Sequence, residues 1–525
     1  MTLATSAATA TTAEGTVRGT TSLVDGREVS CFLGIPYAGS PAGARRFLPP
    51  VPAKGWAGVR DCTAGGPAAP QNPEVPAPPG LRPRTWNESE CLNLNVWTPD
   101  VAGSGLPVMV WVHGGAYISG SGSDGMYDGG NLVSAGGTVV VTINYRLGAL
   151  GFLHLGGLLG DEYADSSNVA LLDVLEALRW VQKNIGAFGG DAANVTVFGE
   201  SAGAAAVGTL LGMPASRGLF QRAIMQSGTA ERYRNVPDSA RISLEFLSLC
   251  GLDSGRARDL LALPVERLLE AQEKLVQRFG ARTYAVPLPF QPTVGTPSLP
   301  VPPLESVRSG LSSEVDLLIG TNLNEGSFAV EMRPKNPSEP SFKQRAAAVL
   351  ADGGADPGRA GEYAEALGSI LGAEPSGKQL LEAAISDAVY RQPSNRLLDA
   401  RRGSSGKTFS YLFTWRSPAM GGKLGACHAL DIPFVFRQLA SPEAEFLTRG
   451  TAPQGLSDMM STAWAAFALT GEPAAVGSPE WPVYGAARRT MVLDELPRVE
   501  DDPRRELREV LERQISGFPA SKHPA

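Results

Sequence analysis

A serine flanked by glycines, in Gly199-Glu-Ser-Ala-Gly203, is the segment of this sequence best suited to do chemistry. The short apolar run Val195–Phe198 precedes it, and the run of small residues Ala204–Leu211 follows it. A strand that turns through Gly-x-Ser-x-Gly into a helix exposes the serine hydroxyl as a nucleophile. We therefore predict that Ser201 attacks a carbonyl carbon, and that the Ala202 N–H at the helix N-terminus helps to stabilise the resulting oxyanion.

A second glycine-rich segment, His113-Gly-Gly-Ala-Tyr117, directly follows the apolar run Val108–Val112. A glycine pair after a strand lets backbone N–H groups point at one spot without hindrance from side chains. The sequence therefore predicts that this segment completes an oxyanion hole, as it does in α/β-hydrolases. The alternative is an ordinary glycine-rich turn, and we expect His113 itself only to shape the loop by a hydrogen bond.

A serine nucleophile needs a base, and the chain has four histidines. His523 is close to the C-terminus, His113 belongs to the glycine-rich loop, and His154 precedes the nucleophile. Hydrolases of this type place serine, acid and histidine in that order along the chain, which leaves His428 as the base.

By the same order, the acid falls between residues 201 and 428. Glu325 fits best because it follows the apolar run Val315–Ile319 and stands in a turn rich in asparagine and glycine. Several other carboxylates lie in this interval, Asp316 among them, so position alone leaves the choice open.

The elements that must position these residues alternate between strand and helix from about residue 91 to 230, which indicates an α/β fold. We predict a large mixed, mostly parallel sheet with helices on both faces. Helical insertions around 238–280 and 340–400 are expected to cap the active site, at the edge where ligands bind in such sheets. Residues 1–13 are predicted to be a disordered tail, and 14–525 a single domain. The expected strands are Leu92–Trp97, Pro107–Val112, Val139–Asn144, Val315–Thr321 and Phe409–Phe413, and the expected helices include Val169–Asn184 and Asp502–Gln514.

The composition excludes several classes of protein. The 525 residues carry a net charge of −7 with no dense lysine and arginine stripe, so we expect no nucleic-acid partner. Apolar runs are too short to span a bilayer, and the N-terminus lacks the pattern of a secretory signal. Five cysteines are too few for a disulfide framework in a chain of this length. We therefore predict a cytoplasmic protein without a membrane partner, acting as a monomer.

Taken together, the motifs resemble the type-B carboxylesterase family, the cholinesterase-like α/β-hydrolases that include bacterial p-nitrobenzyl esterases. The resemblance runs from about residue 15 to 500. It rests on the serine segment and on Phe32-Leu-Gly-Ile-Pro-Tyr-Ala38, Cys91-Leu-Asn-Leu-Asn-Val-Trp97, Asn144-Tyr-Arg-Leu-Gly-Ala-Leu-Gly-Phe152 and Ala223-Ile-Met-Gln-Ser-Gly228. It implies hydrolysis of a small-molecule ester through an acyl-enzyme, with no cofactor and no metal. The implied residues are the triad Ser201, Glu325 and His428 and the oxyanion donors Gly115, Ala116 and Ala202.

The resemblance also suggests residues that contact substrate. Glu200 matches the acid that cholinesterases carry beside the nucleophile, while Leu288 and Phe290 resemble the acyl-pocket stretch of the family. No aromatic residue aligns with the choline-binding tryptophan, so we expect apolar, mostly neutral carboxylic esters as substrates.

One departure from the family pattern and several alternative functions leave questions open. Ala69 replaces a cysteine that often forms a disulfide in the family, so a pairing of Cys62 with Cys91 is left undecided. The fold also occurs in catalytically silent adhesion or scaffold proteins, and an acyltransferase or carbamate hydrolase could use the same triad. The complete triad argues against the silent alternative.

Overall fold

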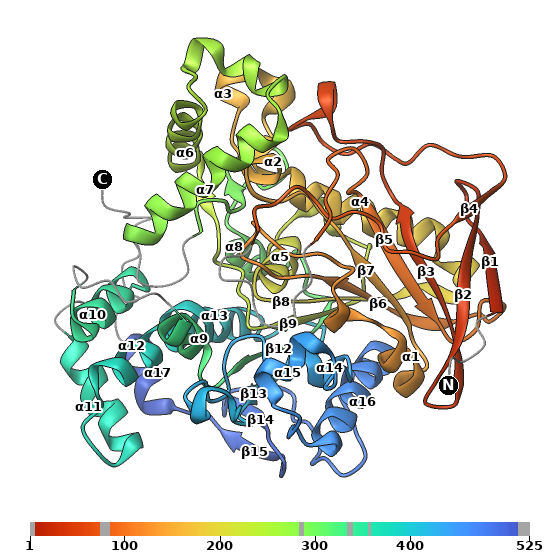
Figure 1. Ribbon diagram of the computed structural model, residues 1–525. Coiled ribbons are helices and arrows are strands. Elements are labelled where there is room, and N and C mark those ends of the chain that lie inside the picture. Colours follow the sequence, from red (N-terminus) through yellow and green to blue (C-terminus); the bar gives the residue numbers. More distant parts are fainter. Residues whose placement is uncertain (1–5, 74–83, 283–287, 333–339, 355–358, 513–525) are drawn as a thin grey trace.

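The computed structural model describes residues 6–73, 84–282, 288–332, 340–354 and 359–512. Its centre is a 13-stranded sheet that crosses the molecule in Figure 1, with the strand order β1-β2-β3-β5-β7-β6-β8-β9-β12-β13-β14-β15 and β4 beside β2. The strands from β7 to β14 run parallel, whereas β1, β2, β3 and β5 at one end and β15 at the other pair antiparallel. The predicted mixed, mostly parallel sheet is confirmed.

The 13 strands of the sheet have the following bounds: β1 (Ser6–Thr11), β2 (Thr16–Val24), β3 (Arg27–Pro36), β4 (Val59–Asp61), β5 (Asn93–Thr98), β6 (Leu106–Val112), β7 (Val139–Ile143), β8 (Gly190–Glu200), β9 (Arg222–Gln226), β12 (Asp316–Asn322), β13 (Thr408–Phe413), β14 (Arg489–Leu493) and β15 (Arg498–Asp501). A separate two-stranded pair joins β10 (Arg234–Asn235) to β11 (Thr293–Val294).

Both faces of the central strands are buried, and strand β6 shows why. Val108, Val110 and Val112 pack into one hydrophobic cluster with helices α4 (Val169–Asn184) and α5 (Ala202–Leu210). Met109 and Trp111 face the other way, into a cluster that includes helix α16 (Gln454–Thr470). Because side chains alternate along a strand, a strand covered by helices on both faces has to be apolar throughout.

The two predicted insertions are helical and form two separate groups, green and teal in Figure 1. The first holds α6 (Val236–Leu249) and α7 (Val265–Arg282). The second holds α10 (Phe342–Asp352), α11 (Ala360–Leu371), α12 (Gly377–Ile385), the π-helix η9 (Ser386–Arg391) and α13 (Gln392–Ala400). The other α-helices are α1 (Gly130–Gly136), α2 (Gly148–Phe152), α3 (Gly156–Leu159), α8 (Pro303–Arg308), α9 (Glu325–Met332), α14 (Ile432–Val435), α15 (Pro442–Thr448) and α17 (Arg505–Glu512).

The predicted disordered tail is wrong over residues 6–11, which form strand β1 (Ser6–Thr11) against β2. Every second residue turns inward, so that Ala8 and Ala10 are buried in the main core. A segment of threonine and alanine looks polar in sequence, but small side chains on one face and backbone hydrogen bonds suffice for an edge strand. Residues 1–5 of the predicted tail lie outside the described residues.

All five cysteines fall within the described ranges, and none forms a disulfide there. The Cys62 and Cys91 thiols are both buried, and burial raises the pKa of Cys62 to about 11.

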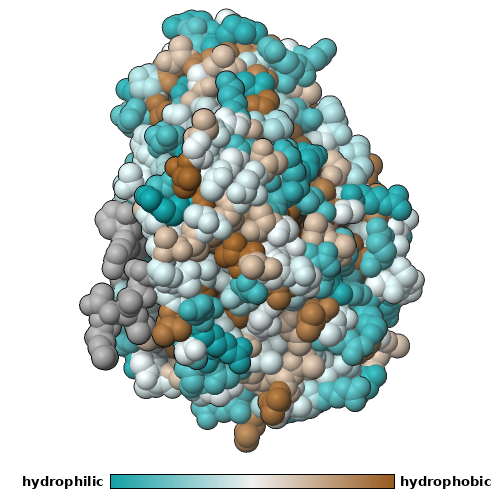
Figure 2. Space-filling view, turned by 90° about the vertical axis from the view of Figure 1, so that its right-hand side faces the viewer, coloured by the Kyte–Doolittle hydropathy of each residue, from teal (hydrophilic) through white to brown (hydrophobic). Residues whose placement is uncertain are grey.

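Hydrophobic side chains on the face shown in Figure 2 occur as small groups separated by hydrophilic ones. Within the described ranges, no helix is both long enough and apolar enough to cross a bilayer.

Candidate active site

Ser201 occupies the tight turn between strand β8 and helix α5, with φ 55° and ψ −121°. This conformation strains any residue that has a Cβ, and such strain is typical of functional sites. Glycine is required on either side because a Cβ on Gly199 or Gly203 would lie 2.6 or 1.9 Å from the Val112 carbonyl oxygen of strand β6. The strained serine is therefore held by close packing of β8, α5 and β6.

Glu325, His428 and Ser201 form one hydrogen-bonded line. His428 Nδ1 lies 2.6 Å from Glu325 Oε2, and His428 Nε2 lies 2.9 Å from Ser201 Oγ. The second oxygen of Glu325 accepts a hydrogen bond of 2.7 Å from the Asn322 N–H. The structure thus brings together all three residues predicted for the triad from positions more than 100 residues apart in sequence.

The loops that carry the acid and the base are bonded to each other. The Asn324 N–H donates to the Ala426 carbonyl at 2.9 Å, and the Ala426 N–H donates back to the Asn324 side chain at 3.1 Å. Asn322 Nδ2 donates to the Cys427 carbonyl at 2.7 Å. These bonds fix the Glu325 to His428 geometry through the backbone, so it does not depend on the two side chains alone.

The glycine-rich loop lies against the nucleophile. A Cβ on Gly114 would lie 2.8 Å from Glu200 Oε2 and 3.2 Å from the Ser201 Cβ, so only glycine allows this approach. Gly115 has φ 107° and Ala116 has φ 55°, which turns the loop sharply after strand β6. Among the described residues, the N–H groups of Gly115, Ala116 and Ala202 have no hydrogen-bond partner, so they are free to bind an oxyanion.

The contacts of His113 and His154 indicate that these two histidines have structural roles. The His113 ring stacks on Tyr145 with 4.5 Å between ring centroids, and burial lowers the pKa of His113 to about 4. His154 Nδ1 lies 3.3 Å from Ser167 Oγ, and His523 lies outside the described residues.

Asp316, the other carboxylate considered, is at the opposite end of strand β12 from Glu325. One of its oxygens accepts a hydrogen bond of 2.7 Å from the Lys407 N–H, and the other lies 3.6 Å from Arg222 Nε.

Glu200 contacts the base directly. Its Oε1 lies 3.2 Å from His428 Nε2, and its side chain is almost completely buried. Burial raises the pKa of Glu200 to about 8, although the adjacent His428 acts in the opposite direction. Burial alone would lower the pKa of His428, but the Glu200 and Glu325 carboxylates outweigh it and raise that pKa to about 9.

The contacts of His428 predict a shifted pH profile. Only the neutral imidazole can accept the Ser201 proton, so kcat/KM rises with pH as His428 loses its proton. We expect the acid limb of kcat/KM to titrate above 6.5, the ordinary histidine value. Replacing Glu200 with glutamine removes one of the two carboxylates, so the acid limb should move to lower pH.

The matched control is Glu273→Gln, which neutralises an exposed glutamate that accepts a bond from Gln277 on the surface. It should leave the pH profile of kcat/KM in place. An acid limb below 6.5 in the unmodified enzyme, or one that Glu200→Gln does not move, would contradict this account of the base.

A cavity with an empty volume of about 390 Å³ opens beside the nucleophile. Of the two residues predicted to contact substrate, Leu288 lines this cavity, whereas Phe290 does not and is fully buried in the main core, with its ring 6.4 Å from that of Phe246. The lining residues are Ala116, Tyr117, Ser201, Ala202, Ala205, Ser227, Gly228, Thr229, Arg232, Leu288, Val389 and Tyr390.

Sequence reasoning missed Arg232 and Tyr390. Arg232 follows strand β9 and donates a weak hydrogen bond of 3.4 Å to the Val389 carbonyl. The Tyr390 ring, from the second helical insertion, packs on His428 with 4.8 Å between centroids. Neither residue belongs to a local sequence motif. Tertiary packing of the second insertion against the sheet brings them to the cavity, so the sequence alone did not reveal them.

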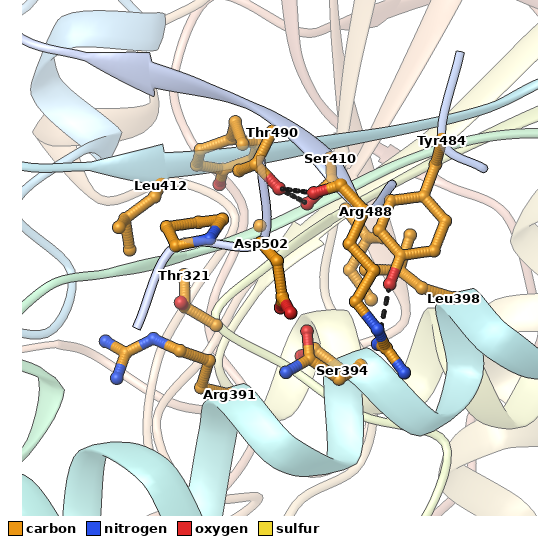
Figure 3. A pocket seen from close by; sticks show the side chains of 15 residues that line it. Thr321, Arg391, Ser394, Leu398, Ser410, Leu412, Tyr484, Arg488, Thr490 and Asp502 are labelled. Carbon is orange, nitrogen blue, oxygen red and sulfur yellow. Dashed lines mark hydrogen bonds between the residues drawn. The ribbon is translucent and has the colours of Figure 1, made fainter. Parts of the chain in front are cut away.

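A second cavity, with an empty volume of about 430 Å³, lies between strands β12 and β13 and helix α13 (Figure 3). Its charged side chains are already paired, since Arg391 bonds Asp387, Arg488 bonds Asp399, and Asp502 bonds Arg508. Dashed lines in Figure 3 show further internal bonds, from Arg488 to Tyr484 and between Thr490 and Ser410. Within the described part of the chain, this cavity therefore has no unpaired charged side chain to recognise a ligand.

Comparisons with known proteins agree with the geometry. Residues 6–508 match the model of the carboxylesterase family. The chain is 36% identical to the para-nitrobenzyl esterase of Bacillus subtilis (strain 168), over 95% of this chain and 98% of that protein. A solved PNB esterase structure superposes with a TM-score of 0.82 at 35% identity, covering 97% of this chain and 99% of its own. A carboxylesterase structure from Geobacillus stearothermophilus gives the same TM-score and identity, covering 96% of this chain and all (100%) of its own.

Proposed function

Since the chain belongs to the carboxylesterase family, we propose that Ser201, His428 and Glu325 are its catalytic triad. The protein is a serine carboxylesterase with the α/β-hydrolase fold. The observation that carries the assignment of residues is the line of hydrogen bonds from Glu325 Oε2 through His428 to Ser201 Oγ.

The geometry supports a two-step hydrolysis. His428 Nε2 takes the Ser201 proton while Oγ attacks the ester carbonyl, and Glu325 holds the ring in the required tautomer and stabilises its cation. The imidazolium then gives the proton to the leaving alcohol, which breaks the ester bond and leaves an acyl-enzyme. Water repeats the sequence and frees the acid.

The oxyanion of each tetrahedral intermediate is proposed to bind the N–H groups of Gly115, Ala116 and Ala202. The Ala202 N–H also lies at the N-terminus of α5, where the helix dipole favours negative charge. These donors are in place before reaction, so stabilising the oxyanion costs little reorganisation.

We propose apolar, mostly neutral carboxylic esters as the general substrate class. Ala116, Ala205, Leu288 and Val389 give much of the cavity wall an apolar character. The only charged side chain that lines this cavity, within the described residues, is the cation of Arg232, so the cavity itself offers no anion to a quaternary ammonium.

A panel of esters tests this substrate class. We expect short- and medium-chain p-nitrophenyl esters to be hydrolysed with kcat/KM at least about 100-fold above acylcholines of equal acyl length, corresponding to some 3 kcal/mol between transition states. Triglyceride emulsions should also be poor substrates. Preference for acylcholines, or activation by an emulsified surface, would contradict the proposed cavity.

We also propose that residues 14–525 form a single catalytic domain with the insertions at 238–280 and 340–400 as its cap. Val389 and Tyr390, which line the cavity, come from the second insertion and support that arrangement. A cytoplasmic location is proposed as well, on the small number of cysteines in a chain of 525 residues.

A further inference from the structure

Arg232 places a positive charge in the cavity beside the nucleophile. Its side chain is partly buried, and the loss of water around it lowers the pKa of the guanidinium from its ordinary value. Burying a charge without a partner is costly, so partly buried arginines are normally paired with carboxylates. An arginine that lines a substrate cavity and has no carboxylate partner is suited to bind an anionic ligand.

No carboxylate within the described part of the chain pairs with Arg232. Its neighbour Glu231 is paired with Arg396 instead. Both Nε and Nη2 of Arg396 lie within hydrogen-bond distance of the Glu231 oxygens. Among the described residues, the guanidinium makes only the weak hydrogen bond to the Val389 carbonyl, so most of its donors have no partner there.

Two hydroxyl groups in the same cavity also lack a partner. Tyr117 and Ser227 line the cavity at 1% and 0% exposure, and neither hydroxyl has a hydrogen-bond partner among the described residues. The Arg232 cation acts electrostatically on the Tyr117 hydroxyl, opposing the rise in the pKa of Tyr117 that burial causes. Buried hydroxyls normally have a hydrogen-bond partner, so these two are available to bind a polar group of a ligand.

The chemistry at Ser201 decides which half of the ester enters this cavity. The leaving alcohol has to face His428 Nε2 to receive its proton, and His428 is not among the residues that line the cavity. The oxyanion residues Ala116 and Ala202 do line it. The cavity therefore takes the acyl half.

We propose that the acyl cavity recognises a carboxylate at the far end of the acyl chain, bound by the Arg232 guanidinium with the Tyr117 and Ser227 hydroxyls. The preferred substrates are then half-esters of short dicarboxylic acids. Their apolar methylene groups lie against Leu288 and Val389, and hydrolysis releases a dicarboxylate and an alcohol. This inference rests on the proposed triad and departs from the neutral substrate class proposed above in one respect, because the acyl half of the preferred ester carries a negative charge.

A matched pair of benzyl esters tests the proposal. The succinate half-ester and benzyl isocaproate have acyl groups of nearly equal shape, but only the first ends in a carboxylate. We expect the wild-type enzyme to favour the half-ester in kcat/KM. Arg232→Met should lower the ratio of half-ester to isocaproate on the order of 10- to 100-fold, because a hydrogen-bonded ion pair to the substrate is lost. Arg232→Lys should retain part of the ratio, since the charge remains but the planar fork is gone.

The control is Arg256→Met, which removes an exposed arginine that is bonded to Asp259 and does not line the cavity. It should leave the ratio unchanged. Equal or better turnover of isocaproate by the wild type, or a ratio that Arg232→Met does not alter, would overturn the proposal.

Failure of the triad can be separated from failure of this inference. Calorimetric titration of the Ser201→Ala protein with succinate measures anion binding without any turnover, because succinate has no ester bond to hydrolyse. Binding that Arg232→Met abolishes supports the anion site even if the triad assignment fails. Absence of binding in a protein that hydrolyses isocaproate through Ser201 overturns the anion site alone.

Discussion

Replacing Ser201 with alanine is expected to lower kcat for p-nitrophenyl ester hydrolysis on the order of 10⁶-fold, because no other group can form the acyl-enzyme. The change removes only the hydroxyl bonded to His428 Nε2 at 2.9 Å. Alanine has the same backbone preferences as serine at φ 55°, so the turn should persist. Steady-state assays and thermal unfolding of the same preparation check both statements.

The companion control for this variant is Ser254→Ala, which changes an exposed serine in the surface 3-10 helix η7 (Ser254–Leu261). It should retain full activity. Hydrolysis by Ser201→Ala within tenfold of wild type would show that another residue supplies the nucleophile.

Replacing Glu325 with glutamine is expected to lower kcat about 10⁴-fold, the effect of changing the acid in serine-histidine-acid triads. Glu325 accepts one bond from the Asn322 N–H and one from His428 Nδ1, through different oxygens. An amide has only one acceptor oxygen, so one of the two donors loses its partner. The imidazolium also loses the negative charge that stabilises it during reaction.

The control for Glu325→Gln is Asp316→Asn, which neutralises a carboxylate at the start of strand β12, whereas Glu325 begins helix α9 beyond the other end of that strand. It should change kcat by less than about threefold, because Asp316 contacts Arg222 and Lys407 and not the base. A larger loss of activity from Asp316→Asn than from Glu325→Gln would mean that the acid has been assigned wrongly.

The catalytic geometry was predictable because local rules determine it. Glycines at 199 and 203 are dictated by the approach of β8 and α5 to the Val112 carbonyl, so the sequence motif carries the turn with it. The helix Val169–Asn184 was predicted with its observed bounds, since apolar residues recur at helical spacing along a long segment. The order of serine, acid and histidine then indicated His428, whereas it left several carboxylates open and the resemblance to the family was needed to favour Glu325.

Features that depend on contacts between distant segments were not predictable. The insertion helices bring Tyr390 to His428, and the loop after β9 brings Arg232 to the cavity, without a local motif for either. The raised pKa of His428 likewise follows from the approach of Glu200, a distance that spacing in the sequence does not give. Strand β1 was missed because its pairing with β2, and not its own composition, decides its structure.

Active-site titration with a fluorescent organophosphonate tests the central claim most directly. One phosphonyl group per chain should be incorporated in proportion to the loss of esterase activity, and fragmentation should place it on Ser201. Ser227, which lines the same cavity, is the internal comparison and should remain unlabelled. Inactivation with the adduct on Ser227 or any other residue, or full labelling with activity retained, would contradict the assignment of Ser201 as the nucleophile.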